Sequence, residues 1–411
     1  MRSARIRKSL RALEHRNYRL YFSGQMVSLV GTWMQGLAMS WLVYRLTGSA
    51  FLLGSIGFLN SLPMLALGPV AGVMIDRWDR RKVLMTTQTL FACNAGILSA
   101  LVLTNRIQVW HLFVITAISG LIMSFDMPTR QTFVADMVPD RADLMNAIAL
   151  NSVLFNSTRL IGPAAAGFVV ARVGEGLCFL LNSVSYLAVI AAFAGMTVAP
   201  PTERPAGHLA AQLREGLTYV RETHAIRTIL MLVLITSFMG MSYQVLMPVV
   251  ARDILRGDAS TLGFLTSGVG LGAMVAGLRL ASRTRAVGLE KQSVLGASLA
   301  GAGLIAIGLS RWFPVSLACM ILTGFGFMTL NSANNTAIQT IVPDSRRGRV
   351  MSIYTTIFFG TNTFGSLFVG SLAQRFNAPV TLVVSGASCL CAGFLFSLHK
   401  ADIRRALASA T

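Results

Sequence analysis

Twelve apolar runs of roughly twenty residues follow one another along this chain of 411 residues. A helix rises about 1.5 Å per residue, so each run is long enough to cross a hydrocarbon core of about 30 Å. The runs lie at about 18–44, 51–75, 83–104, 110–136, 144–171, 176–197, 227–251, 261–281, 292–310, 314–341, 350–374 and 379–398. Only 12% of the residues are charged, against about 25% in a typical soluble domain. The sequence therefore predicts an all-α membrane protein with twelve transmembrane helices.

The basic residues are distributed unevenly between the two faces that these spans define. An even number of spans places both termini on one side of the membrane, and 26 of the 35 Lys and Arg fall on that side. Seven fall on the opposite face, and two, Arg159 and Arg279, are assigned to spans. Arg19, Arg130 and Arg227 also fall inside the approximate span limits, near the same side as the termini, and are counted with the 26. Because cytoplasmic loops carry such an excess of Lys and Arg, we expect both termini in the cytoplasm. The net charge of +19 then reflects topology and contact with anionic lipid, and it does not indicate a nucleic-acid partner.

Motifs for bound groups and for catalysis are missing from the sequence. There is no GxxxxGK phosphate-binding loop, no HExxH or clustered Cys and His, and no nucleophile elbow. The five cysteines lie in or at the end of apolar spans, without zinc spacing. Residues 1–17 are basic and lack a cleavage pattern, so we expect a retained anchor. We expect no metal, no cofactor and no enzymatic activity.

One hydrophilic segment, 198–226, divides the chain into two sets of six spans. It contains three prolines, followed by Arg and Glu residues on one face of an expected surface helix. We therefore predict an N-terminal six-helix bundle at 1–197, a cytoplasmic linker at 198–226 and a C-terminal six-helix bundle at 227–411.

The two halves repeat each other. A Val-Pro-Asp triplet occurs at 138–140 and again at 342–344, which is 204 residues later. The following span of each half carries two glycines and a terminal arginine at an offset of 203: Gly162, Gly167 and Arg172, then Gly365, Gly370 and Arg375. Two parallel six-helix repeats are the architecture in which one half rocks against the other around a midplane site.

The turn between the second and third spans, GVMIDRWDRRK at 72–82, places a carboxylate and several cations between two apolar runs. Gly72 permits close helix contact, and Asp76 lies where the next helix presents backbone amides. The segment has two interpretations. It is a basic loop that only sets orientation, or it is a polar latch that breaks and re-forms as the protein changes state.

This turn is similar to the loop between spans two and three of the major facilitator superfamily, which the whole chain resembles. The matching residues are Gly72, Asp76, Arg77, Arg80 and Arg81. The chain departs from that pattern at Asp79, where the family prefers Gly. In the second half the pattern is degenerate, with Gly277 retained and Ala281 in the Asp position. The resemblance implies two pseudo-symmetric bundles and alternating access in a bacterial inner membrane.

Two further segments, EHRNYRLYFSGQMVSLVGTWMQ at 14–35 and LNSVLFNSTRLIGPAAAG at 150–167, look most like the enterobactin-exporter and macrolide-efflux branch. Gly162, Pro163 and Gly167 resemble a span-five motif of exporters, with Phe168 in place of its last Gly. A Pro-Gly break of this kind permits tight packing, which we expect against a helix of the other half. The resemblance therefore favours efflux.

Asp126 and Arg159 are the charged residues that we single out within the spans. Asp126 lies about 24 Å along span four, within expected reach of Arg80 or Arg81, and is similar to the family's partner of the loop arginine. Asp126 has three interpretations: a member of an interfacial ion pair, a state-dependent gate or a proton carrier.

Arg159 lies past the midplane, where an arginine is costly. It reaches the interface by snorkelling, or it is a cavity cation for an anionic or catecholate-like group.

Amide side chains near mid-span depth are candidates for the substrate cavity. Each one is also explained by a hydrogen bond between helices. The candidates are Gln35, Asn60, Gln244, Asn331, Asn334 and Asn335.

The functional hypothesis is a monomeric secondary transporter that exports an amphipathic small molecule, such as a siderophore or a drug, in exchange for protons. Membrane lipid and the small-molecule substrate are the expected partners. Two alternatives stay open on the same fold. One is a lipid flippase or a nutrient importer, and the other is a membrane sensor or assembly protein that does not transport.

Overall fold

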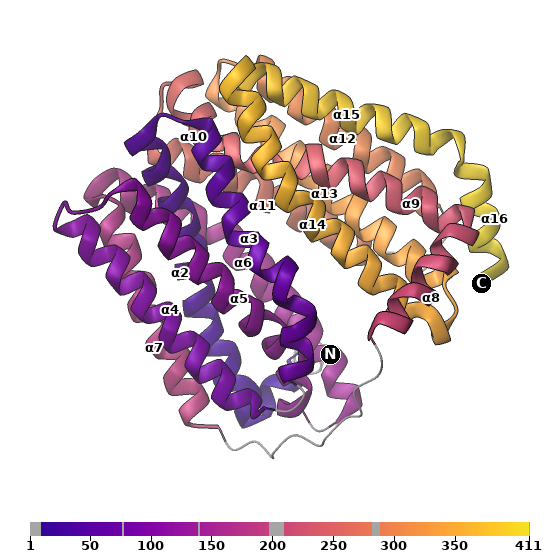
Figure 1. The fold of residues 1–411 in the computed structure, drawn as a ribbon, viewed down its shortest axis with the longest axis horizontal. Coiled ribbons are helices and arrows are strands. Elements are labelled where there is room, and N and C mark those ends of the chain that lie inside the picture. Colours follow the sequence, from indigo (N-terminus) through magenta and orange to yellow (C-terminus); the bar gives the residue numbers. More distant parts are fainter. Residues whose placement is uncertain (1–9, 76–77, 139, 197–208, 282–287, 411) are drawn as a thin grey trace, which may run out of the picture. The chain divides into compact units, whose positions relative to one another are not determined.

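The computed structural model describes residues 10–75, 78–138, 140–196, 209–281 and 288–410. Every regular element within these residues is a helix, as Figure 1 shows. The chain divides into two compact units. One unit comprises Met1–Leu46 and Leu62–Ala206, and the other comprises Thr47–Ser61 and Gly207–Thr411.

The helices of the N-terminal half are long and joined by short connections. They are η1 (Arg11–Glu14), α2 (Arg16–Thr47), α3 (Ala50–Ile75), α4 (Arg80–Leu103), α5 (Val109–Met137), α6 (Arg141–Val173) and α7 (Glu175–Ala194). Asp79, the residue that departs from the family pattern, caps α4 by accepting hydrogen bonds from the backbone N–H of Arg81 at 3.0 Å and of Lys82 at 3.2 Å. A carboxylate is a favoured N-cap, so the departure stabilises the start of this helix.

The C-terminal half begins with a surface helix and contains several shorter segments. Its elements are α8 (Leu209–Glu222), α9 (His224–Ile235), η2 (Thr236–Gly240), η3 (Met241–Leu246), α10 (Met247–Val249), η4 (Val250–Ile254), α11 (Ala259–Ala281), α12 (Leu289–Leu309), α13 (Phe313–Ile341), α14 (Asp344–Phe376), α15 (Ala378–Leu398) and α16 (Lys400–Ala410).

Eleven helices among the described residues are long and apolar enough to cross a membrane. They correspond to the predicted runs, except that 350–374 falls in α14. This helix is continuous over 33 residues, but its Thr, Ser, Gly and Asn residues make it more polar than the other spans. The prediction of an all-α membrane protein is confirmed, and a count of twelve spans depends on α14.

The predicted seventh span is irregular, because it changes from α-helix to wider and tighter turns between Thr236 and Ile254. Gly240 permits close packing there, since a Cβ atom at this position would lie 2.5 Å from Sγ of Cys389. Pro248 lacks a backbone N–H, which removes one hydrogen bond from the segment. Such interruptions are tolerated in membranes when neighbouring helices cover them.

The first half of α3 belongs to the second unit and packs against α14. A Cβ atom at Gly54 would lie 3.0 Å from Cα of Gly370, so the two backbones touch. Ser49 Oγ donates to Gln374 Oε1 at 3.1 Å, and the rings of Phe58 and Phe364 are 5.6 Å apart. The domain boundaries at 197 and 227 did not anticipate this grouping, and they remain a proposal.

Candidate functional site

The candidate site is built around two charged residues one turn apart on α5. Arg130 Nη2 lies 2.5 Å from Asp126 Oδ2, and Arg130 Nε lies 3.1 Å from the same oxygen. An i,i+4 spacing places both side chains on one face of the helix. Pro128 lies between them and removes one backbone hydrogen bond from the helix. Asp126 is only 2% exposed and the Arg130 side chain is 22% exposed, so the carboxylate is buried and the guanidinium is partly buried.

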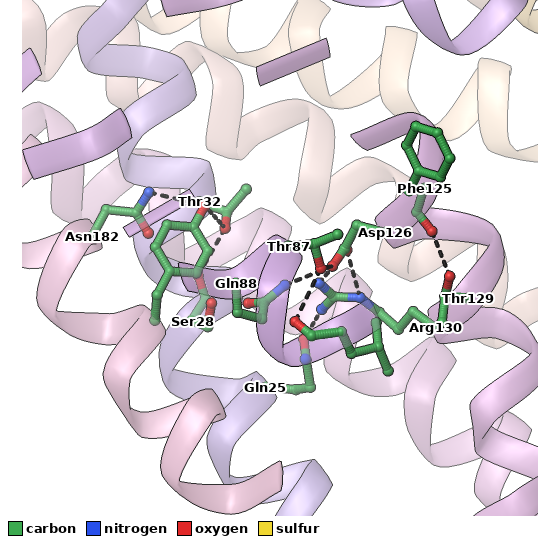
Figure 2. Close-up of polar contacts among 12 residues, drawn as sticks. Gln25, Ser28, Thr32, Thr87, Gln88, Phe125, Asp126, Thr129, Arg130 and Asn182 are labelled. Carbon is green, nitrogen blue, oxygen red and sulfur yellow. Dashed lines mark hydrogen bonds and ion pairs between the residues drawn. The ribbon is translucent and has the colours of Figure 1, made fainter. Parts of the chain in front are cut away.

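Two neighbouring helices complete the hydrogen bonds of this pair, as Figure 2 shows. From α4, Thr87 Oγ1 and Gln88 Nε2 each donate to Asp126 Oδ1 at 2.7 Å. From α2, Gln25 Oε1 accepts from Arg130 Nη1. Both carboxylate oxygens are therefore occupied, and α2, α4 and α5 are joined through one ion pair.

The network is not completely satisfied. Gln25 Nε2 and Gln88 Oε1 are buried and have no hydrogen-bond partner within the described part of the chain. Buried polar atoms are normally paired, and a buried ion pair adds little net stability because both charges lose water. The network therefore does not stabilise the fold by its packing. Charged groups that are kept inside a membrane despite such a cost in free energy are functional candidates.

A second group of polar side chains lies between α2 and α7. Asn182 Nδ2 donates to Gln35 Oε1 at 2.7 Å and to the Tyr186 hydroxyl at 3.3 Å. The Tyr186 and Thr32 hydroxyls are 3.5 Å apart. Gly31 makes this approach feasible, because a Cβ atom there would lie 2.5 Å from Asn182 Oδ1. Gln35, one of the predicted cavity amides, is thus bound between two helices.

In the described part of the turn between α3 and α4, the arginines bind Asp136 and Ala194 and not Asp126. Asp76 and Arg77 lie outside the described residues, as does the side-chain environment of Gly72. Arg80 Nη1 donates to both oxygens of Asp136, at 2.9 and 2.8 Å, and Arg81 Nη2 donates to the carbonyl oxygen of Ala194 at 2.8 Å.

The predicted pairing of Asp126 with Arg80 or Arg81 is therefore wrong in this structure. Asp136 lies ten residues further along α5, which is about 15 Å along a helix. It is closer to the end of α5 that meets the start of α4, so it provides the carboxylate for Arg80. The latch role of this turn remains a proposal, now with Asp136 as the partner.

The span-five motif lies within the continuous helix α6. A Cβ atom at Gly162 would lie 2.5 Å from Cβ of Trp33 and 3.2 Å from the carbonyl oxygen of Val30, both on α2. This contact lies inside the first unit, and the predicted packing of the motif against a helix of the other half stays a prediction. Pro163 is accommodated without ending the helix, and Gly167 is buried about one turn further along it.

Arg159 lies one turn before Gly162, beside the same tryptophan. Its guanidinium carbon is 6.0 Å from the centre of the Trp33 ring. The Phe155 ring meets the indole edge-on, with ring centres 5.6 Å apart. An aromatic face is therefore one of the neighbours of this intramembrane cation.

The remaining amides are dispersed. Asn60 and Gln244 have exposed side chains, and Asn331 Nδ2 is 3.7 Å from Sδ of Met241. Asn334 is completely buried and accepts a hydrogen bond from Ser293 of α12 at 2.7 Å, so it does not line an open space. Asn335 accepts from Gln339 at 2.5 Å. Asn331, Asn334 and Asn335 of span ten therefore have separate partners and do not form one cluster.

Sequence reasoning missed Arg130, Gln25, Asn182 and Tyr186. Arg130 was counted with the cytoplasmic cations, although its side chain binds a buried carboxylate. One signal was available, since Asp126 with Arg130 and Asn182 with Tyr186 are polar pairs at i,i+4 within apolar runs. Within the described residues, no group of three His, Cys, Asp or Glu side chains could hold a metal ion.

The chain is similar to known membrane proteins over nearly its whole length. A family model described as "Transmembrane secretion effector" matches residues 8–410. The staphyloferrin A transporter of Staphylococcus aureus is 24% identical over 92% of this chain and 94% of its own length. The multidrug efflux pump Tap of Mycolicibacterium fortuitum is 24% identical, with coverage of 89% and 92%.

Similarity extends to an enterobactin exporter and to solved structures. The exporter EntS of Shigella boydii is 24% identical over 95% of this chain and 93% of its own length. The crystal structure of the nucleoside transporter NupG superposes with a TM-score of 0.73 at 10% identity, covering 94% of this chain and 98% of that one. At such identity the structural match concerns the fold alone.

Proposed function

Since this chain belongs to the major facilitator family of transmembrane secretion effectors, we propose that it exports an amphipathic small molecule from a bacterial cell in exchange for protons. Family membership confirms the resemblance found in the sequence, and the family and its relatives are membrane transporters and not enzymes. The proposal places the protein in the inner membrane as a monomer, with both termini in the cytoplasm. Relatives named for siderophores and for drugs support a siderophore-like or drug-like substrate.

The observation that carries the proposal is the buried ion pair between Asp126 and Arg130. A proton that reaches Asp126 removes its negative charge and leaves the partly buried Arg130 cation without its carboxylate partner. Leaving one member of a buried pair alone costs about 3–5 kcal/mol, so the side chain or its helix moves to a new acceptor. Because Gln25, Thr87 and Gln88 hold the pair from α2 and α4, that movement changes how three helices pack.

Proton exchange at Asp126 would then bias the unit between two arrangements, as alternating access requires. Arg80 and Asp136 provide a second pair at the turn between α3 and α4. In the proposal this pair is the latch that opens in one arrangement and closes in the other.

The test uses inside-out membrane vesicles from cells that express the protein, with rhodamine 123 and fluorescein as transported probes. We expect accumulation of at least one dye when a pH gradient is imposed, and its loss when nigericin collapses that gradient. The Asp126→Asn variant should accumulate the dye at least tenfold more slowly, because its side chain cannot exchange a proton.

Glu175→Gln is the matched control. Glu175 is 5% exposed and paired with Arg45 at 2.7 Å, so this variant also removes one buried carboxylate from an arginine. Its transport should stay within twofold of the unmodified protein. Undiminished transport by Asp126→Asn would exclude this residue as the proton carrier. Dye binding without accumulation under any gradient would favour the sensor alternative.

A further inference from the structure

An open cavity lies between α2 and α7, and we call it the α2–α7 groove. Its volume is about 300 Å³, at the lower end of the range for small-molecule pockets. The two helices touch here, because a Cβ atom at Gly24 would lie 3.2 Å from Cβ of Ala192. Five of the six lining residues have side chains no larger than that of serine, which leaves the space unfilled. The lining residues are Leu20, Ser23, Gly24, Ala188, Ala191 and Ala192.

The surface around the α2–α7 groove is apolar. Ser23 and Ala191 are exposed, and the Ser23 hydroxyl donates to the carbonyl oxygen of Leu20 at 3.0 Å. One turn further from this end of each helix, Val27 and Leu187 are 50% and 56% exposed. Large exposed apolar side chains on two neighbouring spans indicate a face that lipid covers. The groove therefore suits a hydrocarbon chain better than a polar solute.

The α2–α7 groove lies near one surface of the membrane. The helix α7 has 20 residues, Glu175–Ala194, which rise about 30 Å and match the thickness of the hydrocarbon core. Charged groups mark both of its ends, because Glu175 forms an ion pair at the first and Ala194 accepts a hydrogen bond from Arg81 at the last. Ala191 lies only three residues before Ala194, which is about 5 Å along the helix.

Two arginines of α2 lie at the same end of the groove. Arg16 precedes Leu20 by four residues and Arg19 precedes Ser23 by four, so each cation is one turn from a lining residue on the same face. Both arginines are exposed, and neither forms an ion pair within the described residues. Side chains on a helix incline toward its N-terminus. Both guanidinium groups therefore extend from the groove toward the membrane surface.

Arg81 of α4 adds a third cation at this end. Its Nη2 donates to the carbonyl oxygen of Ala194 at 2.8 Å, and its Nε has no hydrogen-bond partner in the part of the chain that the structure describes. A Cβ atom at Gly195, the next residue, would lie 3.7 Å from Cδ1 of Leu20. The Arg81 guanidinium is therefore close to the Leu20 end of the groove.

From the groove and its cations we propose that this end of α2 and α7 binds an anionic phospholipid, with an acyl chain in the groove and the phosphate at Arg16 and Arg19. Guanidinium groups bind phosphate through paired hydrogen bonds, and basic pockets between membrane spans bind anionic head groups. A zwitterionic head group carries its own cation, so charge complementarity favours the anionic lipid. The lipid is a bound partner and not the exported molecule, so the proposal does not depend on the proposed function.

Native mass spectrometry of the full-length protein in detergent tests this site. It measures the affinity for phosphatidylglycerol and for phosphatidylcholine with the same acyl chains. We expect the first phosphatidylglycerol to bind at least tenfold more tightly than phosphatidylcholine. Glycerol phosphate, which has the phosphate but no acyl chain, should bind at least tenfold more weakly than phosphatidylglycerol.

Two variants separate the charge of the site from the shape of the groove. The double variant Arg16→Gln, Arg19→Gln should weaken phosphatidylglycerol binding at least fivefold and leave phosphatidylcholine binding unchanged. Ala191→Leu fills the groove and leaves the charge as it is, and it should weaken phosphatidylglycerol binding at least fivefold. All three positions are exposed, so we expect both variants to fold, and size-exclusion chromatography checks this.

Each variant has a matched control. Arg221→Gln, Arg227→Gln removes the same charge from two exposed arginines of the second unit, and Ala100→Leu adds the same side chain at an exposed position of α4. Their phosphatidylglycerol affinities should stay within twofold of the unmodified protein.

Four results would overturn the proposal. They are equal affinity for the two lipids, equal losses in the Arg16→Gln, Arg19→Gln variant and its control, full phosphatidylglycerol affinity in Ala191→Leu, or binding of glycerol phosphate as tight as that of phosphatidylglycerol. The last result would indicate a site for free phosphate, and the one before it would indicate a charged surface without a groove for the chain.

Discussion

Asp126 and Arg130 depend on each other more than on the rest of the protein. Either charge alone would be buried without compensation, whereas the two together are tolerated. Thr87 and Gln88 add neutral donors at 2.7 Å that stabilise the ionised carboxylate and hold it in one orientation. We therefore expect the stability effects of substituting Asp126 and Arg130 to be strongly non-additive.

We predict that Arg130→Gln lowers the free energy of unfolding by about 3–5 kcal/mol, because it leaves Asp126 buried and unpaired. The double variant Asp126→Asn, Arg130→Gln should recover most of that loss, since neither buried charge remains. Transport should be absent in both variants. The measurement is thermal unfolding in detergent alongside vesicle transport. Additive losses in the double variant would contradict a coupled pair.

At the scale of helices, glycine contacts set how closely the spans of the second unit approach. Gly272 of α11 lies against the backbone of Ile321 and Phe325 on α13, where a Cβ atom would lie 2.7 Å from the Phe325 nitrogen. Gly296 and Gly326 bring α12 and α13 together in the same way. Association of helices in lipid depends on such packing, because no hydrophobic gain is available between them.

We predict that Gly272→Ala destabilises the protein by about 1–3 kcal/mol, since the added methyl group forces the two backbones apart. Gly36→Ala in α2 is the control, because a Cβ atom there meets nothing within 4 Å. That substitution should be neutral or stabilising by up to about 1 kcal/mol. The measurement is thermal unfolding of both variants. Equal changes in stability would contradict the importance of close packing at Gly272.

At the scale of the whole molecule, the repeat and the charge distribution predict one topology. Six spans between them place the N-terminal region and the 198–226 linker on the same side of the membrane, and the excess of basic residues makes that side the cytoplasmic one. The α14 helix is decisive for this count, because it is more polar than the eleven apolar spans. If α14 did not cross the membrane, the C-terminus would lie on the opposite side.

Single cysteines introduced into a cysteine-free background test this arrangement. We expect Leu10→Cys, Glu222→Cys and Ser409→Cys to react with an impermeant maleimide only in inside-out vesicles. Asn105→Cys, in the connection between α4 and α5, should react only in intact cells. Labelling of Ser409→Cys from outside would show that α14 does not span the membrane.

The sequence by itself determined the helices, their lengths and their membrane character, because these follow from local hydrophobicity and from the need to satisfy backbone hydrogen bonds in lipid. It also identified Asp126, Arg80 and Arg159 as charges that need an explanation. Only the tertiary structure decided their neighbours, which are Arg130, Asp136 and the Trp33 ring. The reason is physical, since the partner of a side chain depends on how each helix is rotated and how closely glycines let it approach its neighbours. The first half of α3 joined α14 for the same reason, through close contact between Gly54 and Gly370.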